Sequence, residues 1–401
     1  MTAGGSAMSE IEALPKAAPE QQSLFATGRI DRFLCKQSNS TPLIAVDLDI
    51  VRGQYLALAQ LFPQAAIFYA VKANPASAVI AALAPLGANL DLASEGEIDR
   101  CLDLGIAADR LSFGNTIKRE SEIARARERG VNLFAFDSAA ELEKVARAAP
   151  QSRVFCRLLV AGRGAEWPLT RKFGCSAPMA IELLERAATL GLRPAGISFH
   201  VGSQQTDPQQ WPPAIEAAAA IFHACARSGI DLDFLNLGGG LPAHYRSPIP
   251  PLRVYAEVIH GALMKHFGGS RPQIAIEPGR YLVADAGILR ASVLLIARKA
   301  AGARRRWVYL DAGRYNGLAE TQGERIRYRL RTPRDATRVG PVVIAGPTCD
   351  STDIVYDDAR YELPLDLAIG DHVDFLSAGA YTASYASVEF NGFAPIRTYC
   401  I

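Results

Sequence analysis

Short apolar runs alternate along residues 66–279 with segments in which apolar residues return every three or four positions. Each run is almost continuously apolar at its start, which is typical of parallel strands buried on both faces. The spacing between the runs predicts amphipathic helices. We count eight runs: AIFYAVK (66–72), ANLDLAS (88–94), RLSFGN (110–115), NLFAFDS (132–138), RVFCRLLV (153–160), GISFHVGS (196–203), DFLNLGGG (233–240) and QIAIEPG (273–279). The alternation predicts an α/β protein with a (β/α)8 TIM barrel.

The pattern changes after residue 282, where strand-like runs follow one another without long helical segments between them. They predict a separate C-terminal all-β domain; the runs are ASVLLIARK, RRWVYLDAG, RIRYRLRT, PVVIAGP, HVDFLSAG and PIRTYC. We expect a flexible N-terminal tail at 1–22 and a segment at 23–43 that packs on the β domain or the barrel. The barrel is expected at 44–282 and the β domain at 283–401.

Composition narrows the class of protein. The chain has 401 residues, 49% of them hydrophobic, which excludes a disordered or fibrous protein. A net charge of +2 is too small to indicate binding to nucleic acid or to a membrane surface, so we expect a small-molecule partner. No apolar run reaches the roughly 18 residues of a membrane span, and the start lacks a signal-peptide pattern, so we expect a cytoplasmic protein. The 7 cysteines contain no CxxC pair, and neither a disulfide framework nor a metal site is expected.

Polar residues gather where the predicted strands end, which is where barrel active sites form. A single strand-end Asp or His is more often a helix cap or a structural hydrogen-bond partner, but the coincidence at eight strands favours an active site. The residues at or near these ends are Lys72, Asp91, Asn115, Asp137, Arg157, His200, Gly238, Gly239, Gly240 and Glu277.

Lys72 ends the first run in the motif FYAVKANP. A desolvated lysine at the mouth of an apolar barrel has a lowered pKa and can form a Schiff base. The alternative is a lysine whose stem packs on the barrel while its ammonium reaches solvent.

Later strands supply groups that suit a phosphorylated cofactor. The three glycines of NLGGGLP let backbone N–H groups approach a phosphate closely, although alone they are a weak signal. His200 is a flat ring, and Glu277 is a carboxylate that can hold a proton on a pyridine nitrogen. A salt bridge from Glu277 to Arg280 or Arg157 is the structural alternative. Together with a Schiff-base lysine, these groups are what pyridoxal phosphate (PLP) requires.

The chain from about residue 41 to 393 resembles the fold type III PLP-dependent decarboxylases, in particular their ornithine/lysine branch. The resemblance rests on seven motifs that follow the family's order: FYAVKAN, LDLASEGEI, SFHVGS, NLGGGLP, EPGRYLV, GPTCDSTD and GAYTASYASVEFNGF. It implies an alanine-racemase-like barrel and decarboxylation of a basic L-amino acid in polyamine biosynthesis. The expected reaction is L-ornithine to putrescine and CO2, with L-lysine to cadaverine as the second choice.

The resemblance also implies a role for each site residue. Lys72 would hold PLP as a Schiff base, His200 would stack on its ring, and Glu277 would bond its nitrogen. Asp91 would support His200 or the lysine end. The remaining cofactor-binding residues would be Arg157, Ser203, Gly238, Gly239, Gly240, Arg280 and Tyr381.

Two residues of the GPTCD motif are expected to serve the neighbouring subunit. Cys349 would give a proton to the substrate Cα, and Asp350 would meet the distal ammonium, which implies a homodimer with shared sites. Packing is the usual role of a cysteine, but Cys349 falls in a Gly-Pro-Thr-Cys-Asp turn, which favours a functional thiol. Tyr381 is also placed in the substrate site.

A second acidic residue is expected beside the distal ammonium. Alignment of GRYNGLAETQGERIRY puts Glu324 nearest to this position, with Glu320 as the alternative. Ornithine and lysine differ by one methylene, worth about 1 to 3 kcal/mol, so we expect dual activity. Diaminopimelate is disfavoured because that branch has Cys-Glu-Ser where this chain has Cys-Asp-Ser at 349–351.

Three other classes compete with this interpretation. An amino-acid racemase of the same fold typically places arginine at the ring nitrogen, where this chain has Glu277. A non-catalytic regulatory homologue typically loses cofactor residues that are present here. A sugar-phosphate barrel enzyme accounts for the glycines but not for Lys72 or the C-terminal motifs.

Overall fold

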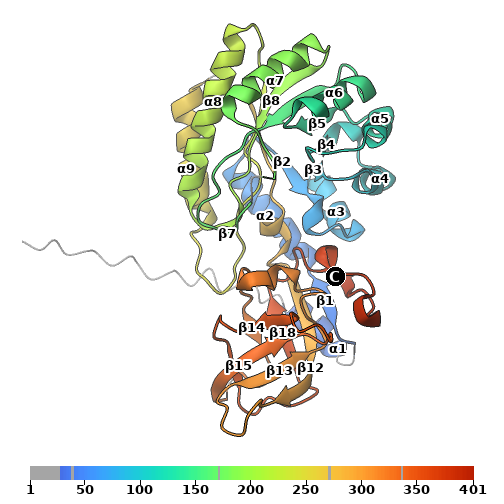
Figure 1. The fold of residues 1–401 in the computed structure, drawn as a ribbon, viewed down its shortest axis with the longest axis vertical. Coiled ribbons are helices and arrows are strands. Elements are labelled where there is room, and N and C mark those ends of the chain that lie inside the picture. Colours follow the sequence, from blue (N-terminus) through green and yellow to red (C-terminus); the bar gives the residue numbers. More distant parts are fainter. Residues whose placement is uncertain (1–27, 38–39, 170–171, 270–271, 336) are drawn as a thin grey trace, which may run out of the picture.

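The computed structural model describes residues 28–37, 40–169, 172–269, 272–335 and 337–401. The predicted tail at 1–22 lies outside the described residues. A barrel and a β domain lie one above the other in Figure 1. No helix among the described residues is long and apolar enough to cross a membrane.

Eight parallel strands close into the barrel in the order β10-β11-β2-β3-β4-β5-β6-β8. They fall within the eight runs expected from the sequence or begin within three residues of them: β2 Ala65–Ala70, β3 Asn89–Leu92, β4 Leu111–Phe113, β5 Leu133–Phe136, β6 Arg153–Arg157, β8 Arg193–Ser198, β10 Phe234–Asn236 and β11 Gln273–Ile276. The predicted α/β barrel is confirmed.

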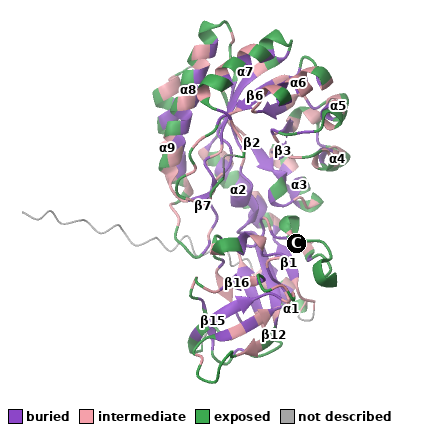
Figure 2. Cartoon of the chain, in the orientation of Figure 1, coloured by how far each residue is buried: buried purple, intermediate pink, exposed green. Residues whose placement is uncertain are grey.

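Amphipathic helices surround these strands, and Figure 2 shows the strands largely buried and the outer helix faces largely exposed. The helices are α2 Leu48–Leu61, α3 Ser77–Leu83, α4 Glu95–Asp103, α5 Glu120–Glu128, α6 Ala139–Ala148, α7 Ala177–Thr189, α8 Trp211–Arg227 and α9 Leu252–Phe267. A short helix, α10 Arg280–Val283, follows β11. Single turns of 3₁₀ helix, such as η2 Val71–Ala73, connect several elements.

The barrel interior is filled by side chains from six strands. Three phenylalanines alternate with three alanines, so that large and small groups fit together as barrel layers require. The Phe155 and Phe234 rings are 5.5 Å apart between centroids, and the Phe68 and Phe234 rings are 6.3 Å apart. The cluster comprises Phe68, Ala135, Phe155, Ala195, Phe234 and Ala275. A packed interior leaves the strand ends as the place for a site.

The second domain is a mostly antiparallel sheet, which confirms the predicted all-β domain. Its strands after the barrel are β12 Gly287–Ala297, β13 Arg306–Leu310, β14 Leu330–Arg331, β15 Val339–Ala345, β16 Ile354–Tyr356, β17 Glu362–Pro364, β18 His372–Leu376 and β19 Arg397–Cys400. A 3₁₀ helix, η6 Ala319–Glu324, lies between β13 and β14. The sequence runs missed β16 and β17, each of three residues.

The sheet also takes a strand from the start of the described chain. Strand β1 Leu43–Val46 pairs antiparallel with β12 and parallel with β19. The expected barrel boundary at residue 44 therefore needs correction, because 44–46 belong to the β sheet and the first barrel element is α2 at Leu48. Helix α1 Arg29–Lys36 buries Ile30 and Leu34 against this sheet, so this part of 23–43 packs on the β domain.

The chain after β18 returns to the barrel and contacts the carboxyl end of β2. The Tyr381 N–H donates to Ala73 O (2.8 Å), and Asn74 Nδ2 donates to Gly379 O (2.8 Å). The Ser384 hydroxyl donates to Lys72 O (3.0 Å). The carboxyl end of this barrel strand therefore faces the β domain.

Gly379 lets this return segment lie against the barrel. A Cβ at Gly379 would be 1.9 Å from Val283 O, a backbone atom that cannot move aside alone. We expect Gly379→Ala to lower the free energy of unfolding by about 1–3 kcal/mol, the usual effect of overpacking. Urea unfolding measures it. The matched control is Gly53→Ala in α2, where no atom lies within 4 Å of the new Cβ and a gain of about 0.5–1 kcal/mol is expected. Equal stability of the two variants would contradict this role of Gly379.

Candidate active site

Lys72 lies in the 3₁₀ turn directly after strand β2. Its Nζ is 3.2 Å from Oδ2 of Asp91, which is buried within strand β3. Gly114 follows strand β4 and leaves room for this carboxylate, since a Cβ there would lie 1.9 Å from Asp91 Oδ1. Of the two placements expected for Asp91, the structure shows the one beside the lysine.

The pKa of Lys72 moves opposite to the sequence-based expectation. Burial lowers the pKa of this lysine, but the attraction of Asp91, Tyr381 and Glu277 outweighs burial and raises the pKa above 10.5. The predicted lowering is therefore wrong for the protein without cofactor. The physical reason is that three acidic groups act on a side chain that keeps 48% of its surface exposed in one chain.

His200 follows strand β8 and is held as a neutral ring. Its Nδ1 accepts a hydrogen bond from the Gly202 N–H (3.1 Å). Burial, together with the positive charges of Arg157 and Lys72, holds the pKa of His200 well below 6.5. A neutral imidazole with its proton on Nε2 presents a flat, uncharged face, which suits stacking on an aromatic ring.

Glu277 follows strand β11, and its carboxylate accepts a hydrogen bond from Asn236 Nδ2. Burial, with the neighbouring charge of Asp91 adding to it, raises the pKa of Glu277 to about 7. No ion pair joins Glu277 to Arg280 or Arg157 within the described ranges. The salt-bridge alternative is therefore not what the structure shows, and the carboxylate stays available to hold a proton.

The glycine loop after β10 brings backbone close to this group. A Cβ at Gly239 would lie 2.6 Å from Glu277 O and 3.1 Å from His200 Nε2, and one at Gly238 would lie 2.0 Å from Phe199 O. A Cβ at Gly240 would lie 2.6 Å from Gly202 O. Only glycine fits these approaches. Within the described part of the chain, the Gly239 and Gly240 N–H groups donate to no other residue, so they are free to meet a phosphate.

Arg280, the first residue of α10, closes this end of the site. Its guanidinium donates to the Ser203 hydroxyl, from Nη2 at 3.0 Å, and lies 4.9 Å from the centroid of the Tyr381 ring. These three residues are the ones expected around the phosphate. The sequence did not indicate two further partners of Arg280, the Tyr245 hydroxyl and the Glu320 carboxylate.

Arg157 ends strand β6 and lies beside the same group. Its guanidinium is 5.4 Å from the centroid of the Phe173 ring. Arg157 and His200 line one cavity together with residues of the loop after β6: Leu158, Leu159, Val160, Gly162, Leu169, Lys172 and Phe173. The cavity provides space next to the His200 ring.

The arrangement passes a direct test for PLP. It combines an amine on Lys72, a flat neutral ring, a carboxylate that titrates near neutrality and two free backbone N–H groups. Asp91 Oδ1 is buried without a hydrogen-bond partner among the described residues. A buried oxygen of this kind indicates a site that is completed by a further group.

Cys349 and Asp350 lie on the surface of the β domain, and no interaction within the described ranges joins them to Lys72, His200 or Glu277. The Cys349 N–H donates to Asn391 Oδ1 (3.1 Å). Asp350 Oδ1 accepts from the Thr352 N–H (2.8 Å) and hydroxyl (2.7 Å), and these hydrogen bonds hold the pKa of Asp350 below its usual value. Within the described part of one chain, Cys349 and Asp350 therefore do not interact with the residues around Lys72.

The two acidic residues considered for the distal ammonium are both engaged elsewhere. Glu324 Oε1 accepts from the N–H groups of Asp357 (2.5 Å) and Asp358 (2.7 Å). Glu320 is buried against Arg280. The placement of Glu324 at the substrate stays a prediction, and Glu320 has a different contact from the one expected.

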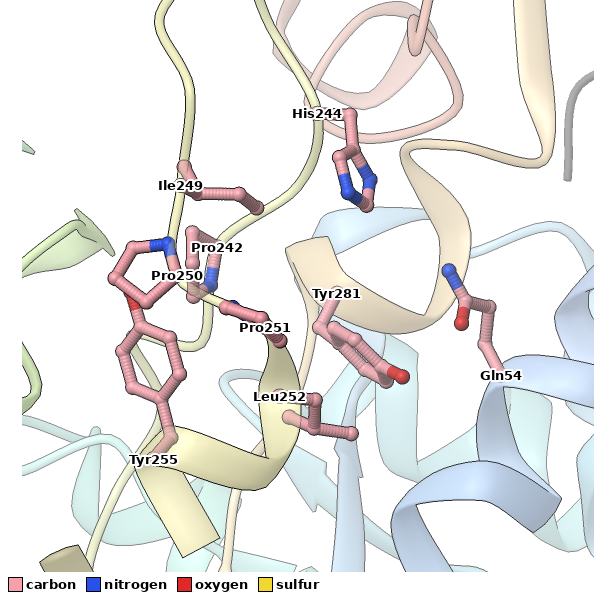
Figure 3. Close-up of a pocket in the computed structure, with 9 residues that line it drawn as sticks. All are labelled: Gln54, Pro242, His244, Ile249, Pro250, Pro251, Leu252, Tyr255 and Tyr281. Atoms are coloured by element: carbon pink, nitrogen blue, oxygen red, sulfur yellow. The ribbon is translucent and has the colours of Figure 1, made fainter. Parts of the chain in front are cut away.

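A separate apolar cavity lies between the loop after β10, the start of α9 and helix α10 (Figure 3). It contains none of the predicted catalytic residues. Its lining is Gln54, Pro242, His244, Ile249, Pro250, Pro251, Leu252, Tyr255 and Tyr281. His244 Nδ1 is 2.6 Å from Asp285 Oδ2, and we assign no chemistry to this cavity.

Comparison with known proteins agrees with the fold and with PLP as the cofactor. Residues 48–284 match the family described as "Pyridoxal-dependent decarboxylase, pyridoxal binding domain". The chain therefore belongs to the PLP-dependent decarboxylases of fold type III, and PLP is its cofactor. It is a carboxy-lyase of this family, similar to members named for ornithine and lysine.

Individual relatives cover most of the chain. The lysine/ornithine decarboxylase of Selenomonas ruminantium is 33% identical over 355 residues, 88% of each chain. The structure of the Vibrio vulnificus lysine/ornithine decarboxylase complexed with putrescine has a TM-score of 0.84 at 31% identity, covering 94% of this chain and 99% of that one. Antizyme inhibitor 2 of Xenopus laevis is 34% identical over 360 residues, 86% of this chain and 77% of that protein.

The raised pKa of Glu277 makes stability depend on pH. A carboxyl whose folded pKa of about 7 exceeds its unfolded value stabilises the fold at low pH, and this contribution is lost as pH rises through 7. Between pH 5 and 8, cofactor-free wild type should therefore lose on the order of 1–3 kcal/mol relative to Glu277→Gln. Urea unfolding along this pH range measures the difference. Exposed Glu182→Gln should follow wild type, and a pH-independent difference for Glu277→Gln would contradict the assignment.

Proposed function

We propose that this protein decarboxylates a basic L-amino acid, L-ornithine first and L-lysine second, and so supplies diamines for polyamine biosynthesis. Relatives named ornithine decarboxylase and lysine/ornithine decarboxylase support this substrate class. A relative named as an inhibitor is equally similar, so the proposal rests on the site residues as well as on identity. The observation that carries the proposal is Lys72 beside Asp91, with neutral His200 and protonatable Glu277 around one space.

Bound PLP supplies an electron sink for the carbanion that remains when CO2 leaves. The residues of this chain provide the conditions for it. Lys72 would hold the cofactor covalently, and Asp91 would keep the lysine end oriented. His200 would cover one ring face, while Glu277 would keep a proton at the ring nitrogen. Packing of the β domain against the carboxyl end of β2 would limit the access of water from that side.

The substrate's distal end is assigned to Asp350. Asp350 is partly exposed in one chain and its lowered pKa keeps it anionic, which suits an ammonium group. Cys349, one residue earlier, would return a proton to Cα after CO2 loss. A surface pocket beside Asp350 includes Tyr315 and Thr352, and Tyr315 packs on Phe390 with ring centroids 4.6 Å apart. These aromatic rings suit the aliphatic part of a diamine.

We propose a homodimer in which Cys349 and Asp350 complete the site of the neighbouring subunit. The support is that both residues lie on the surface of their own chain, close to exposed apolar side chains on the segment 385–393. Exposed apolar residues grouped in this way favour an interface. The members of the group are Tyr385, Val388, Phe390 and Phe393. The cytoplasmic location expected from the sequence stays a prediction.

The reaction is tested by CO2 release with added PLP on L-ornithine, L-lysine, L-arginine and meso-diaminopimelate. We expect the highest kcat/KM on ornithine and a lower one on lysine. Lys72→Ala should lose on the order of 10³-fold or more in activity, because it removes the amine that binds the cofactor. Lys265→Ala, an exposed lysine in the last turn of α9, is the matched control and should keep activity. Bound PLP with no CO2 from any of the four substrates would contradict the proposed substrate class.

The shared site is tested by mixing two inactive variants, Lys72→Ala and Asp350→Ala. In a mixed dimer one of the two sites has both residues intact, so random exchange of subunits should restore about a quarter of wild-type activity. The control replaces the second partner by the double variant Lys72→Ala/Asp350→Ala, which cannot restore a site. Demonstrated exchange of tagged subunits without any recovery of activity would exclude the shared arrangement.

A further inference from the structure

Arg280 and Glu320 form a buried ion pair at the phosphate end of the candidate site. Each side chain is 3% exposed. The pair is bidentate, with Nη2 to Oε1 at 2.6 Å and Nη1 to Oε2 at 2.7 Å. Parallel hydrogen bonds between a guanidinium and a carboxylate are the strong form of this contact. The charge of Arg280 is therefore matched inside the protein.

The remaining donors of Arg280 are also occupied. Nε and Nη2 donate to the Ser203 hydroxyl at 3.3 and 3.0 Å, and Nη1 donates to the Tyr245 hydroxyl at 2.8 Å. Burial alone would lower the pKa of Arg280, but the Glu320 carboxylate, with Tyr245 adding to its effect, holds the pKa well above its usual value. All three nitrogens of the guanidinium are thus committed to neighbours, and the group is fixed in position.

Glu320 lies in η6, the 3₁₀ helix that contains both acidic residues considered from the sequence for the substrate's distal ammonium. Glu320 is the second residue of this helix, and its carbonyl accepts the N–H of Ile326 (3.1 Å). Two residues further along, Gln322 lines the surface pocket that contains Tyr315 and Thr352. The ion pair therefore connects the helix beside that pocket to the arginine of the cofactor site.

We propose that Glu320 is a positioning residue that fixes Arg280 and offsets its charge, so that a phosphate meets a neutral buried pair instead of an isolated cation. The proposal rests on the proposed phosphate-binding role of Arg280 and Ser203. It assigns most of the attraction for the phosphate to the free N–H groups of Gly239 and Gly240. It also gives Glu320 a role different from binding the distal ammonium.

The charge balance has a measurable consequence. Removing the carboxylate leaves Arg280 buried without its counter-ion, so an anion that enters the site gains an attraction that wild type lacks. In cofactor-free E320Q, inorganic phosphate should bind about tenfold more tightly than in wild type, within the usual range of coupling between two neighbouring charges. A purely structural role of Glu320 would lower stability without changing phosphate affinity.

The experiment compares cofactor-free wild type and E320Q by thermal unfolding over a range of inorganic phosphate concentrations. We expect a lower Tm for E320Q without phosphate, a larger rise in its Tm with phosphate, and about a tenfold lower apparent Kd. The matched control is D374N, because Arg290 and Asp374 form another buried bidentate pair, within the β sheet. D374N should lose stability and keep the phosphate affinity of wild type. An unchanged or weaker phosphate affinity in E320Q overturns the proposal.

A second variant serves if E320Q does not fold. E320D keeps the carboxylate on a side chain one methylene shorter, so Arg280 keeps its counter-ion. Because the charge of the pair is unchanged, phosphate affinity should stay within about threefold of wild type. A larger change overturns the proposal. PLP absorbance distinguishes a failure of the proposed function from a failure of the proposed role of Glu320. Wild type without a lysine-bound PLP band contradicts the proposed function. That band together with unchanged phosphate affinity in E320Q contradicts only the role of Glu320.

Discussion

The candidate site depends on hydrogen bonds that tie the lysine turn after β2 to the segment after β18. These contacts join residues about 300 positions apart, from Lys72, Ala73 and Asn74 to Gly379, Tyr381 and Ser384. The barrel carries the lysine and the β domain holds the backbone on either side of it. The carbonyl groups of Lys72 and Ala73 accept hydrogen bonds from the segment after β18, so both domains hold the lysine turn.

The sequence predicted the barrel well for a physical reason. Strands buried on both faces consist of almost continuous apolar residues, and all eight barrel strands fall on or beside such runs. Strands β16 and β17 have three residues each and carry too few positions for a pattern to emerge. Strand β1 reads as apolar as a barrel strand, but pairing with β12 and β19 is a tertiary property that local pattern does not contain.

The sequence predicted which residues gather at the site, but it predicted their charge states less well. Strand ends and motifs pointed to Lys72, His200 and Glu277, and the structure brings these together. The pKa of Lys72 is a sum of opposing effects, and only coordinates show that Asp91 at 3.2 Å, together with Tyr381 and Glu277, outweighs burial. Glu320 was the alternative to Glu324 for binding the distal ammonium because the alignment allowed it, whereas its burial against Arg280 depends on how η6 packs.

The place of β1 also determines the order in which the chain can fold. Its two partners, β12 and β19, are made about 240 and 350 residues later, so at a synthesis rate of about 5–20 residues per second the second partner follows after roughly 20–70 seconds. Until β12 is made, the apolar LIAV segment has no strand beside it, although all four of its residues are buried in the finished fold. The barrel can form during that time. The β domain is therefore the last unit to close, and the hydrogen bonds that hold the lysine turn form only then.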